Sequence, residues 1–312
     1  MIEVQGLSKS FGEFRAVDNV TFSVEPGTVF ALLGPNGAGK TTTIRMLTSI
    51  LVPSTGWATV AGYDVVRDAP QVRASVGVLT EQHGLYERMR GLEYLDFFGR
   101  IYRLEAAARR SRARSLMERF GLGNALDRRV GEYSKGMKQK LALVRALLHD
   151  PPVLLLDEPT SAMDPQSARL VRNAIKELRS DRRTIILTTH NLSEAQELSD
   201  RVAIIRQGRI IAHGDFEELA RRVVGPPLME LRTVQPLNGM VEGLRALVGI
   251  RELDGDRIVY ETANPAETNP NVLRYLLQQG VDVLTLSRVS ETLESIYLNI
   301  VEEDEDQEQV TR

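Results

Sequence analysis

One stretch of the sequence is more informative than any other: Gly34-Pro35-Asn36-Gly37-Ala38-Gly39-Lys40-Thr41-Thr42. The apolar run Val29-Phe30-Ala31-Leu32-Leu33 precedes it and the helix-like run Ile44-Arg45-Met46-Leu47 follows it. A strand, a glycine-rich turn that ends in Gly-Lys-Thr and a helix, in this order, form a phosphate-binding loop, whose backbone N–H groups and helix N-terminus attract phosphate. We therefore predict that Lys40 reaches the β- and γ-phosphates of a nucleotide and that the Thr41 hydroxyl holds Mg²⁺.

Two further apolar runs end in side chains that suit nucleotide chemistry. The run Val153-Leu154-Leu155-Leu156 is typical of a buried parallel strand, and it ends in Asp157 and Glu158. Adjacent carboxylates at the end of a buried strand are costly unless they meet a cation, so we predict that Asp157 joins the Mg²⁺ shell and that Glu158 polarises an attacking water. A run at 184–187 leads to His190. A lone histidine is usually structural, but at this edge of a parallel sheet it could contact the γ-phosphate.

Two helix starts carry polar residues that suggest caps. Ser134 precedes a helical pattern that has Gly136 and no acidic residue in its first turn, which makes it either an ordinary cap or a second anion site. Asn191 and Glu194 resemble a capping box at the start of a later helix. In addition, Phe11 lies on an expected loop upstream of the phosphate site, where its ring could stack on adenine or belong to the core.

The composition excludes several classes of function. The chain has 312 residues, a formal charge of -3 and a pI near 5.9, so it lacks the basic field of a protein whose main partner is nucleic acid. The chain contains no cysteine, so it forms no disulfide and no thiolate metal site. No apolar run approaches the roughly 20 residues that span a bilayer, and no signal pattern opens the sequence. We therefore expect a protein on the cytosolic side, soluble when isolated, that contacts a membrane only through a partner.

The pattern of the chain indicates an α/β fold with more than one domain. We expect a nucleotide-binding domain over 1–224 with a helical subdomain at about 83–150. The turn Gly225-Pro226-Pro227 is the clearest linker. A β-α-β-β-α-β order then predicts a small ferredoxin-like α+β domain over 228–301, and the acidic tail at 302–312 is expected to be disordered.

Taken together, residues 2–222 closely resemble the ATP-binding subunit of an ABC transporter. The resemblance rests on the complete set of family motifs in order, and the set is far more specific than any one motif. They are Walker A at Gly34 to Thr42, the signature Tyr133-Ser134-Lys135-Gly136-Met137, Walker B ending at Glu158, the D-loop Ser161-Ala162-Met163-Asp164 and the switch histidine His190. The signature departs from the common Leu-Ser-Gly-Gly-Gln, and it is similar to that of the subgroup that serves ABC-2-type exporters. The C-terminal domain matches only loosely.

The resemblance implies a P-loop NTPase fold of the ABC type, with a mixed sheet core, an antiparallel β subdomain and a helical subdomain. It implies an ATPase that uses ATP and Mg²⁺ and pairs head to tail with an identical or different ATP-binding subunit. The pair is expected to drive a separate polytopic membrane permease that exports a drug, lipid, polysaccharide or ion. A rival class is the soluble ABC ATPases of translation or DNA repair. The implied ATP-binding residues are Phe11, Val17, Gly34, Pro35, Asn36, Gly37, Ala38, Gly39, Lys40, Thr41, Thr42 and Gln82, with Tyr133, Ser134, Lys135, Gly136 and Met137 serving the ATP of the partner subunit.

One position departs from the family pattern. The family has Gly-x-x-x-Gln in a strand after Walker A, and the glutamine touches Mg²⁺ and the attacking water; counted from Gly77, that place is Glu81, and the amide follows at Gln82. Neighbouring side chains of a strand point to opposite faces, so only one is expected to reach the metal. The register favours Glu81 and the amide chemistry favours Gln82; we assign the contact to Glu81.

Overall fold

The computed structural model describes residues 1–80, 84–161, 163–180, 183–223, 227–237, 239–289 and 292–310. The chain divides into two compact units, Met1–Phe216 and Glu217–Arg312, each with a hydrophobic core of its own. The division falls after Phe216, the first residue of helix α8 (Phe216–Val223), whereas the domain expected from the sequence, 1–224, includes this whole helix.

The first unit contains a six-stranded sheet in which three neighbouring strands are buried along their whole length. All of its pairings are parallel except that of the edge hairpin, β9 with β10. The carboxyl ends of the parallel strands therefore meet at one edge, where ligands of open α/β sheets bind. In spatial order the strands are β10 (Arg209–Gly214), β9 (Arg201–Arg206), β3 (Val29–Leu33), β8 (Thr184–Thr189), β7 (Val153–Asp157) and β6 (Val76–Leu79).

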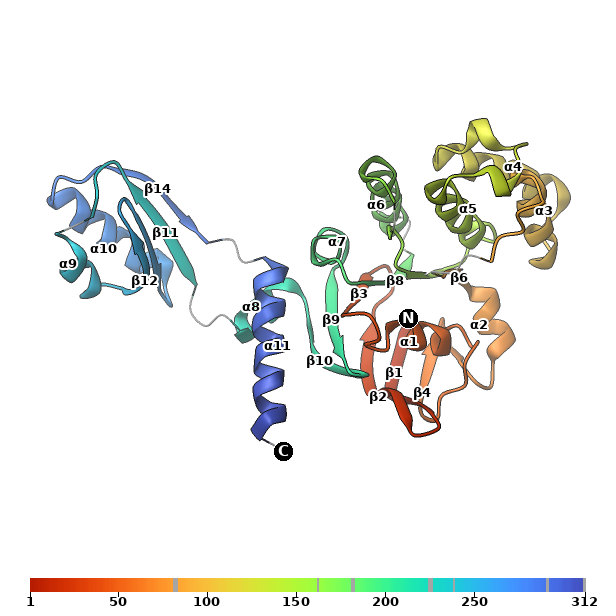
Figure 1. Cartoon of the computed structure of the whole chain (residues 1–312), viewed down its shortest axis with the longest axis horizontal. Helices are drawn as coiled ribbons and strands as arrows, with labels where there is room; N and C mark the ends of the chain where they lie inside the picture. Colours follow the sequence, from red (N-terminus) through yellow and green to blue (C-terminus); the bar gives the residue numbers. More distant parts are fainter. Residues whose placement is uncertain are drawn as a thin grey trace. The chain divides into compact units, whose positions relative to one another are not determined.

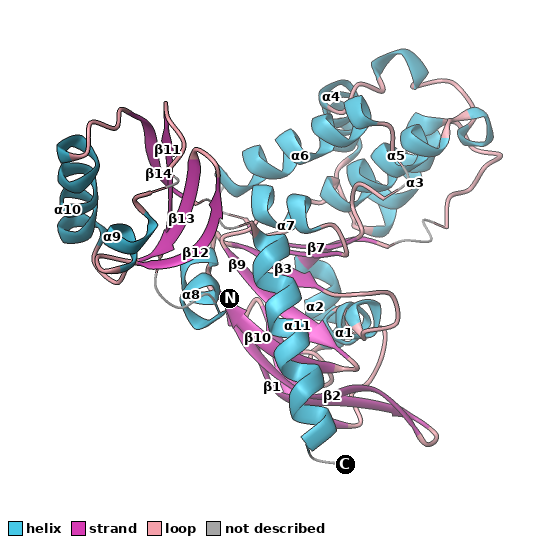
Figure 2. Ribbon diagram, turned by 60° about the vertical axis from the view of Figure 1, so that its left-hand side comes forward, coloured by secondary structure: helices cyan, strands magenta, loops and turns pink. Residues whose placement is uncertain are grey.

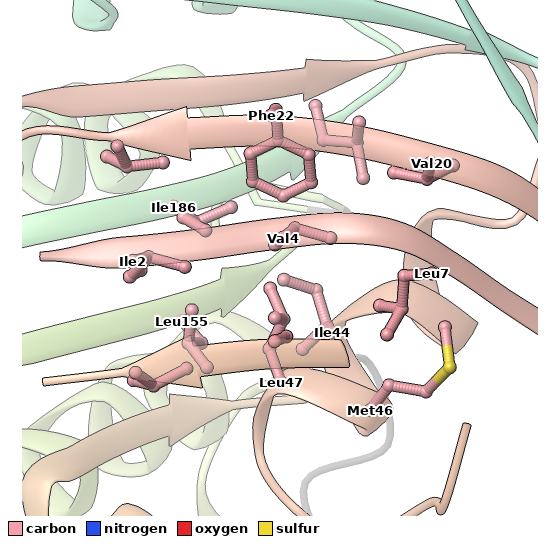
Figure 3. Packing of buried hydrophobic residues seen from close by; sticks show 14 of the residues in the cluster. Ile2, Val4, Leu7, Val20, Phe22, Ile44, Met46, Leu47, Leu155 and Ile186 are labelled. Atoms are coloured by element: carbon pink, nitrogen blue, oxygen red, sulfur yellow. The ribbon is translucent and has the colours of Figure 1, made fainter. Parts of the chain in front are cut away.

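A second, four-stranded antiparallel sheet packs on the same core. Its order is β2 (Phe14–Val24), β1 (Ile2–Phe11), β4 (Thr55–Val60) and β5 (Tyr63–Asp64). Helix α1 (Lys40–Leu47) contributes Ile44 and Leu47 to a cluster that also holds Val4 from the antiparallel sheet and Leu155 and Ile186 from the parallel sheet (Figure 3). The helix that follows the phosphate loop is thus fixed by both sheets.

Six further helices and two short 3-10 turns complete the described part of the first unit. Between β6 and β7 the chain forms a helical subdomain, as expected, and its three long helices lie together, apart from the antiparallel sheet (Figure 1). The segments are α2 (Ala69–Ser75), α3 (Gly91–Ile101), α4 (Ala106–Arg119), α5 (Lys135–Leu147), α6 (Pro165–Ser180) and α7 (Leu192–Leu198), with short 3-10 turns at Gly123–Ala125 and Val130–Glu132.

The second unit has the expected β-α-β-β-α-β order. Its four strands form one antiparallel sheet in the order β12-β13-β11-β14, and α9 and α10 cover one face of it (Figure 2). Apolar side chains of that face and of both helices form the core of the unit, among them Leu231, Leu244 and Leu276. The elements are β11 (Leu228–Thr233), α9 (Val241–Arg245), β12 (Gly249–Asp254), β13 (Arg257–Glu261), α10 (Pro265–Gln278), β14 (Val283–Arg288) and α11 (Leu293–Val310).

The acidic tail differs from the expectation of disorder. Helix α11 continues through residues 302–310, and its first turns are anchored by the buried side chains of Leu293, Ile296 and Ile300. The tail is rich in Glu and Gln, which have a high helix propensity, so it extends a helix that is already packed.

Candidate nucleotide-binding site

The phosphate loop leaves strand β3 through a glycine that no other residue could replace. A Cβ on Gly34 would lie 2.2 Å from the Ile205 carbonyl oxygen of the neighbouring strand. Gly39 closes the loop at φ 106°, and a Cβ there would lie 2.6 Å from the Ala16 carbonyl oxygen. The loop therefore depends on glycine at both ends, and α1 begins directly after it at Lys40.

A cavity of about 530 Å³ lies along this loop. It brings together residues from the antiparallel sheet, the phosphate loop and the ends of β7 and β8. Its size and its polar lining suit a small-molecule ligand. The lining residues are Phe14, Ala16, Pro35, Asn36, Gly37, Ala38, Gly39, Lys40, Thr41, Thr42, Glu158, Ser161 and His190.

Lys40 is the main positive charge of the cavity. Its side chain is 6% exposed, and its Nζ donates hydrogen bonds to the carbonyl oxygens of Gly34 at 2.7 Å and Pro35 at 3.2 Å. The same Nζ lies 3.5 Å from Oε1 of Glu158. A buried ammonium group is retained only where it meets acceptors and negative charge, which phosphate oxygens supply.

Asp157 and Thr41 offer the oxygen chemistry that Mg²⁺ requires. Asp157 is 1% exposed, and its carboxylate accepts hydrogen bonds from Thr41 Oγ1 at 2.9 Å and from the Thr188 hydroxyl. No group of three or more His, Asp or Glu side chains that could by themselves hold a metal ion is found in the described part of the chain. A hydroxyl beside a carboxylate fits Mg²⁺, because this ion takes one or two protein oxygens and completes its shell with phosphate and water.

Glu158 and His190 face each other across the ends of β7 and β8. His190 Nδ1 lies 3.0 Å from the Glu158 carboxylate, and the Glu158 backbone N–H donates to the Thr188 carbonyl oxygen at 3.1 Å. Glu158 has φ 51°, a left-handed conformation that is uncommon outside glycine. The backbone thus turns between the two acidic residues, so that Asp157 and Glu158 serve different parts of the site.

The signature segment is built as a helix start in the helical subdomain. Ser134 caps α5 by accepting a hydrogen bond from the Met137 backbone N–H at 3.3 Å, and no acidic residue lies in the first turn. A Cβ on Gly136 would come no closer than 3.7 Å to Ser167 Oγ and 3.9 Å to Oδ2 of Asp164, the D-loop aspartate. None of the signature residues lines the cavity of its own phosphate loop.

Tyr133 explains how the unusual signature is accommodated. The ring is 4% exposed, and its hydroxyl donates to the Ala125 carbonyl oxygen at 2.5 Å. Burial raises the pKa of Tyr133 to about 12. A Cβ on Gly91 would lie 2.3 Å from this hydroxyl oxygen, so the tyrosine fits because α3 begins with glycine.

Comparisons with known proteins agree with this geometry. The family model described as "ABC transporter" matches residues 17–161. The daunorubicin resistance ATP-binding protein DrrA3 of Streptomyces coeruleorubidus is 36% identical over 306 residues, which is 97% of this chain and 96% of the relative. The Nod factor export ATP-binding protein I of Paraburkholderia xenovorans is 37% identical over 299 residues, 96% of each chain. The chain belongs to the ATP-binding subunits of ABC transporters.

A solved structure supports the same assignment. It is described as the structure of the ATP binding subunit of an ABC transporter, and it matches with a TM-score of 0.67 and 32% identity over 71% of this chain and 92% of that one. The fold class and the ATPase activity predicted from the sequence of this ABC subunit are thus confirmed. No membrane-spanning helix is found in the part of the chain that the structure describes.

The structure places most of the predicted ATP-binding residues on the cavity and a few elsewhere. Pro35 to Thr42, Glu158 and His190 line it, and Gly34 forms its strand end. Val17 is fully buried beneath the loop, 3.3 Å from where a Cβ on Gly39 would stand. Glu81 and Gln82 lie outside the described residues.

Phe11 is not among the residues that line the cavity, and the interpretation of this ring as core is wrong. Phe11 is 50% exposed, at the end of β1, with Lys9 Nζ 5.3 Å from the ring centroid. Its partner across the hairpin, Phe14, lines the cavity and is 66% exposed. Phe14 and Ala16 were not expected from the sequence, and Ser161 was named only as part of the D-loop. The short span between the two phenylalanines could have indicated a hairpin that presents both rings.

Proposed function

We propose that this ABC subunit pairs head to tail with a second ATP-binding subunit, identical or different, and that the pair drives a separate polytopic membrane permease for export. The observation that carries the proposal is the separation of the signature from its own phosphate loop. A capped, glycine-containing helix start without acidic residues suits an anion, yet none of its residues lines the cavity of the same chain. A partner subunit would bring the missing phosphate to it.

The names of the relatives support the proposed direction and substrate class. These names refer to daunorubicin resistance and to Nod factor export, which favours an export system for a drug-like or lipid-like molecule. The subunit would act at the cytoplasmic face of the membrane, held there by the permease, without nucleic acid. The soluble ABC ATPases of translation and DNA repair are the rival class, and the names of these relatives speak against it.

The contacts in the cavity support a role for each residue. Lys40 would bind the β- and γ-phosphates, and Thr41 and Asp157 would hold Mg²⁺, which would supply charge neutralisation at the phosphates. Glu158 orients and polarises the attacking water, and His190, 3.0 Å from the Glu158 carboxylate, positions that carboxylate and the γ-phosphate. Phe14 is a candidate for stacking on adenine beside Phe11, because it lines the cavity.

Mixing two inactive variants tests the shared site. Lys40→Ala removes the phosphate-binding charge but keeps the signature, whereas Gly136→Asp adds a carboxylate to the signature but keeps Lys40. Lys40→Ala alone is expected to lack ATPase activity because it lacks the charge that binds phosphate. Gly136→Asp alone is expected to lack it because the new carboxylate meets the phosphates of the partner's ATP, and like charges in contact across an interface cost several kcal/mol. In a head-to-tail pair, one site of the mixed dimer combines the two intact halves. We therefore expect the mixture to regain turnover.

The control is Gly136→Ala, whose Cβ has ordinary contacts and which is expected to keep activity. Isolated Gly136→Asp should still bind ATP as a monomer. A mixture that stays inactive although the two variants associate, or a Gly136→Asp monomer that no longer binds ATP, would contradict a site shared between subunits.

We also propose that Glu81 contacts Mg²⁺. Glu81→Ala should then lower Mg²⁺-dependent ATPase activity far more than Gln82→Ala, measured as turnover across a Mg²⁺ titration, since a carboxylate is a hard ligand for this ion. The reverse ranking would assign the contact to Gln82 and indicate a bulge after strand β6, which precedes both residues.

A further inference from the structure

Glu194 is a buried carboxylate behind the catalytic pair. Its side chain is 3% exposed, in the first turn of α7. One carboxylate oxygen accepts a hydrogen bond from Thr160 Oγ1 at 2.5 Å, and the other accepts one from Thr189 Oγ1 at 2.7 Å. The expected capping box is therefore only half formed: the Asn191 side chain caps Glu194 N–H at 3.0 Å, but the Glu194 carboxylate turns inward instead of capping the backbone.

The two threonines belong to the segments that carry the catalytic side chains. Thr160 lies two residues after Glu158, between Walker B and the D-loop, and Thr189 directly precedes His190. The His190–Glu158 contact at 3.0 Å joins these segments at the cavity, and the Glu194 carboxylate joins them a second time behind it.

The burial of Glu194 needs a reason beyond the start of a short helix. Burying a carboxylate is costly, and burial, with the Glu158 charge as a smaller cause, raises its pKa above the usual value. Glu197, on the same helix, shows the ordinary alternative: it is exposed and pairs with Arg172 and Lys176. Glu194 is thus a carboxylate that is costly to bury, and each of its two oxygens accepts a hydrogen bond.

We propose that Glu194 is a positioning residue for ATP hydrolysis: by accepting one hydrogen bond from each segment, it fixes the separation of Glu158 and His190. The inference rests on the proposed roles of these two residues. Loss of the carboxyl group removes the link behind the cavity and leaves only the contacts in front of it, so the catalytic side chains can shift, and small displacements of catalytic groups have large effects on rate.

The experiment compares Glu194→Ala, Glu194→Gln and Glu197→Ala by steady-state ATPase kinetics in the full-length chain, with thermal unfolding measured in parallel. Glu194→Ala should lower kcat by about tenfold or more while the KM for ATP changes little, because Lys40 and the phosphate loop are untouched. Glu194→Gln should stay within about threefold of the wild type, because an amide accepts from one threonine and donates to the other. Glu197→Ala should behave like the wild type.

Two further variants, Thr160→Val and Thr189→Val, leave Glu194 and the start of α7 unchanged. Each should lower kcat, and neither should lower it further in the Glu194→Ala background, because all three belong to one network. The inference is overturned if Glu194→Ala keeps the kcat of Glu197→Ala, or if its effect appears in KM alone. It is also overturned if the kcat of all variants merely follows their thermal stability.

Glu158→Gln is measured in the same assay. If that variant turns over ATP at the wild-type rate, the proposed role of Glu158 fails, whatever Glu194 does. If it is inactive while Glu194→Ala is normal, only the positioning role fails.

Discussion

The two units of the chain use charged residues in opposite ways. In the first unit Lys40, Asp157 and Glu194 are buried, and each is held by specific partners around one cavity. In the second unit the charges form ladders across strands of the sheet: Arg257 pairs with Glu230 at 2.7 Å and with Glu252 at 2.8 Å. Exposed pairs of this kind contribute little to stability, whereas buried ones are costly and point to chemistry.

The two units also differ in a glycine that faces a tyrosine: the ring is buried in the first unit and half-buried in the second. In the first unit a Cβ on Gly91 would lie 2.3 Å from the hydroxyl oxygen of Tyr133, whose ring is buried. In the second unit a Cβ on Gly243 would lie 2.0 Å from the hydroxyl oxygen of Tyr275, whose ring is only half-buried. A ring with an exposed side can move away from a new methyl group, but a buried ring cannot.

The largest difference is therefore expected between Gly91→Ala and Gly243→Ala. Gly91→Ala should destabilise the protein by about 1 to 3 kcal/mol, the usual cost of overpacking, because Tyr133 would have to leave its hydrogen bond to Ala125. Gly243→Ala should cost clearly less. Chemical denaturation of the full chain measures both, and equal losses, or a larger loss for Gly243→Ala, would contradict the distinction between the two sites.

A smaller difference between the two units is expected in how their stability depends on pH. His149 stacks on Tyr102 with ring centroids 3.8 Å apart, its Nε2 donates to the Val76 carbonyl oxygen, and its Nδ1 has no partner among the described residues. Burial lowers the pKa of His149 to about 4 from 6.5. Between these values the unfolded chain binds a proton that the folded chain excludes. The stabilising contribution of the neutral His149 side chain is thus complete above pH 6.5 and is lost as the pH falls from 6.5 to about 4.

Thermal unfolding between pH 4 and 7 measures this effect. His149→Gln, which does not titrate, should lose less stability than the wild type as the pH falls from 6.5 to 4. In the second unit Glu230→Gln is the matched variant: hydrogen bonds from Arg257 and Arg232 hold the pKa of Glu230 below 4.5, so its contribution is lost only at still lower pH. Parallel curves for the wild type and His149→Gln would contradict the role of the buried imidazole.

The sequence indicated many of the residues that line the cavity, because these residues are tied to backbone features. A phosphate loop needs glycine at fixed places, and Asp157 and His190 follow apolar strands whose ends meet at one edge. The family and the fold class were predictable for the same reason, and so was the order of elements in the second unit.

The contributions of side chains from distant segments were not predictable. Phe14 lines the cavity because a hairpin returns the chain to the phosphate loop. The carboxylate of Glu194 has two choices, its own helix start or two threonines from other segments, and only packing decides between them. The acidic run was judged from its charge, whereas the packed turns of α11 before it determine its helical state.

The proposed hydrolysis depends most directly on Glu158, which would polarise the attacking water. Glu158→Gln leaves Lys40, Thr41 and Asp157 in place, so ATP binding should be kept, while turnover should fall by about a hundredfold or more because the general base is lost. The ATP-bound pair should then accumulate and elute as a dimer in size-exclusion chromatography. Wild-type turnover in Glu158→Gln would contradict the assignment.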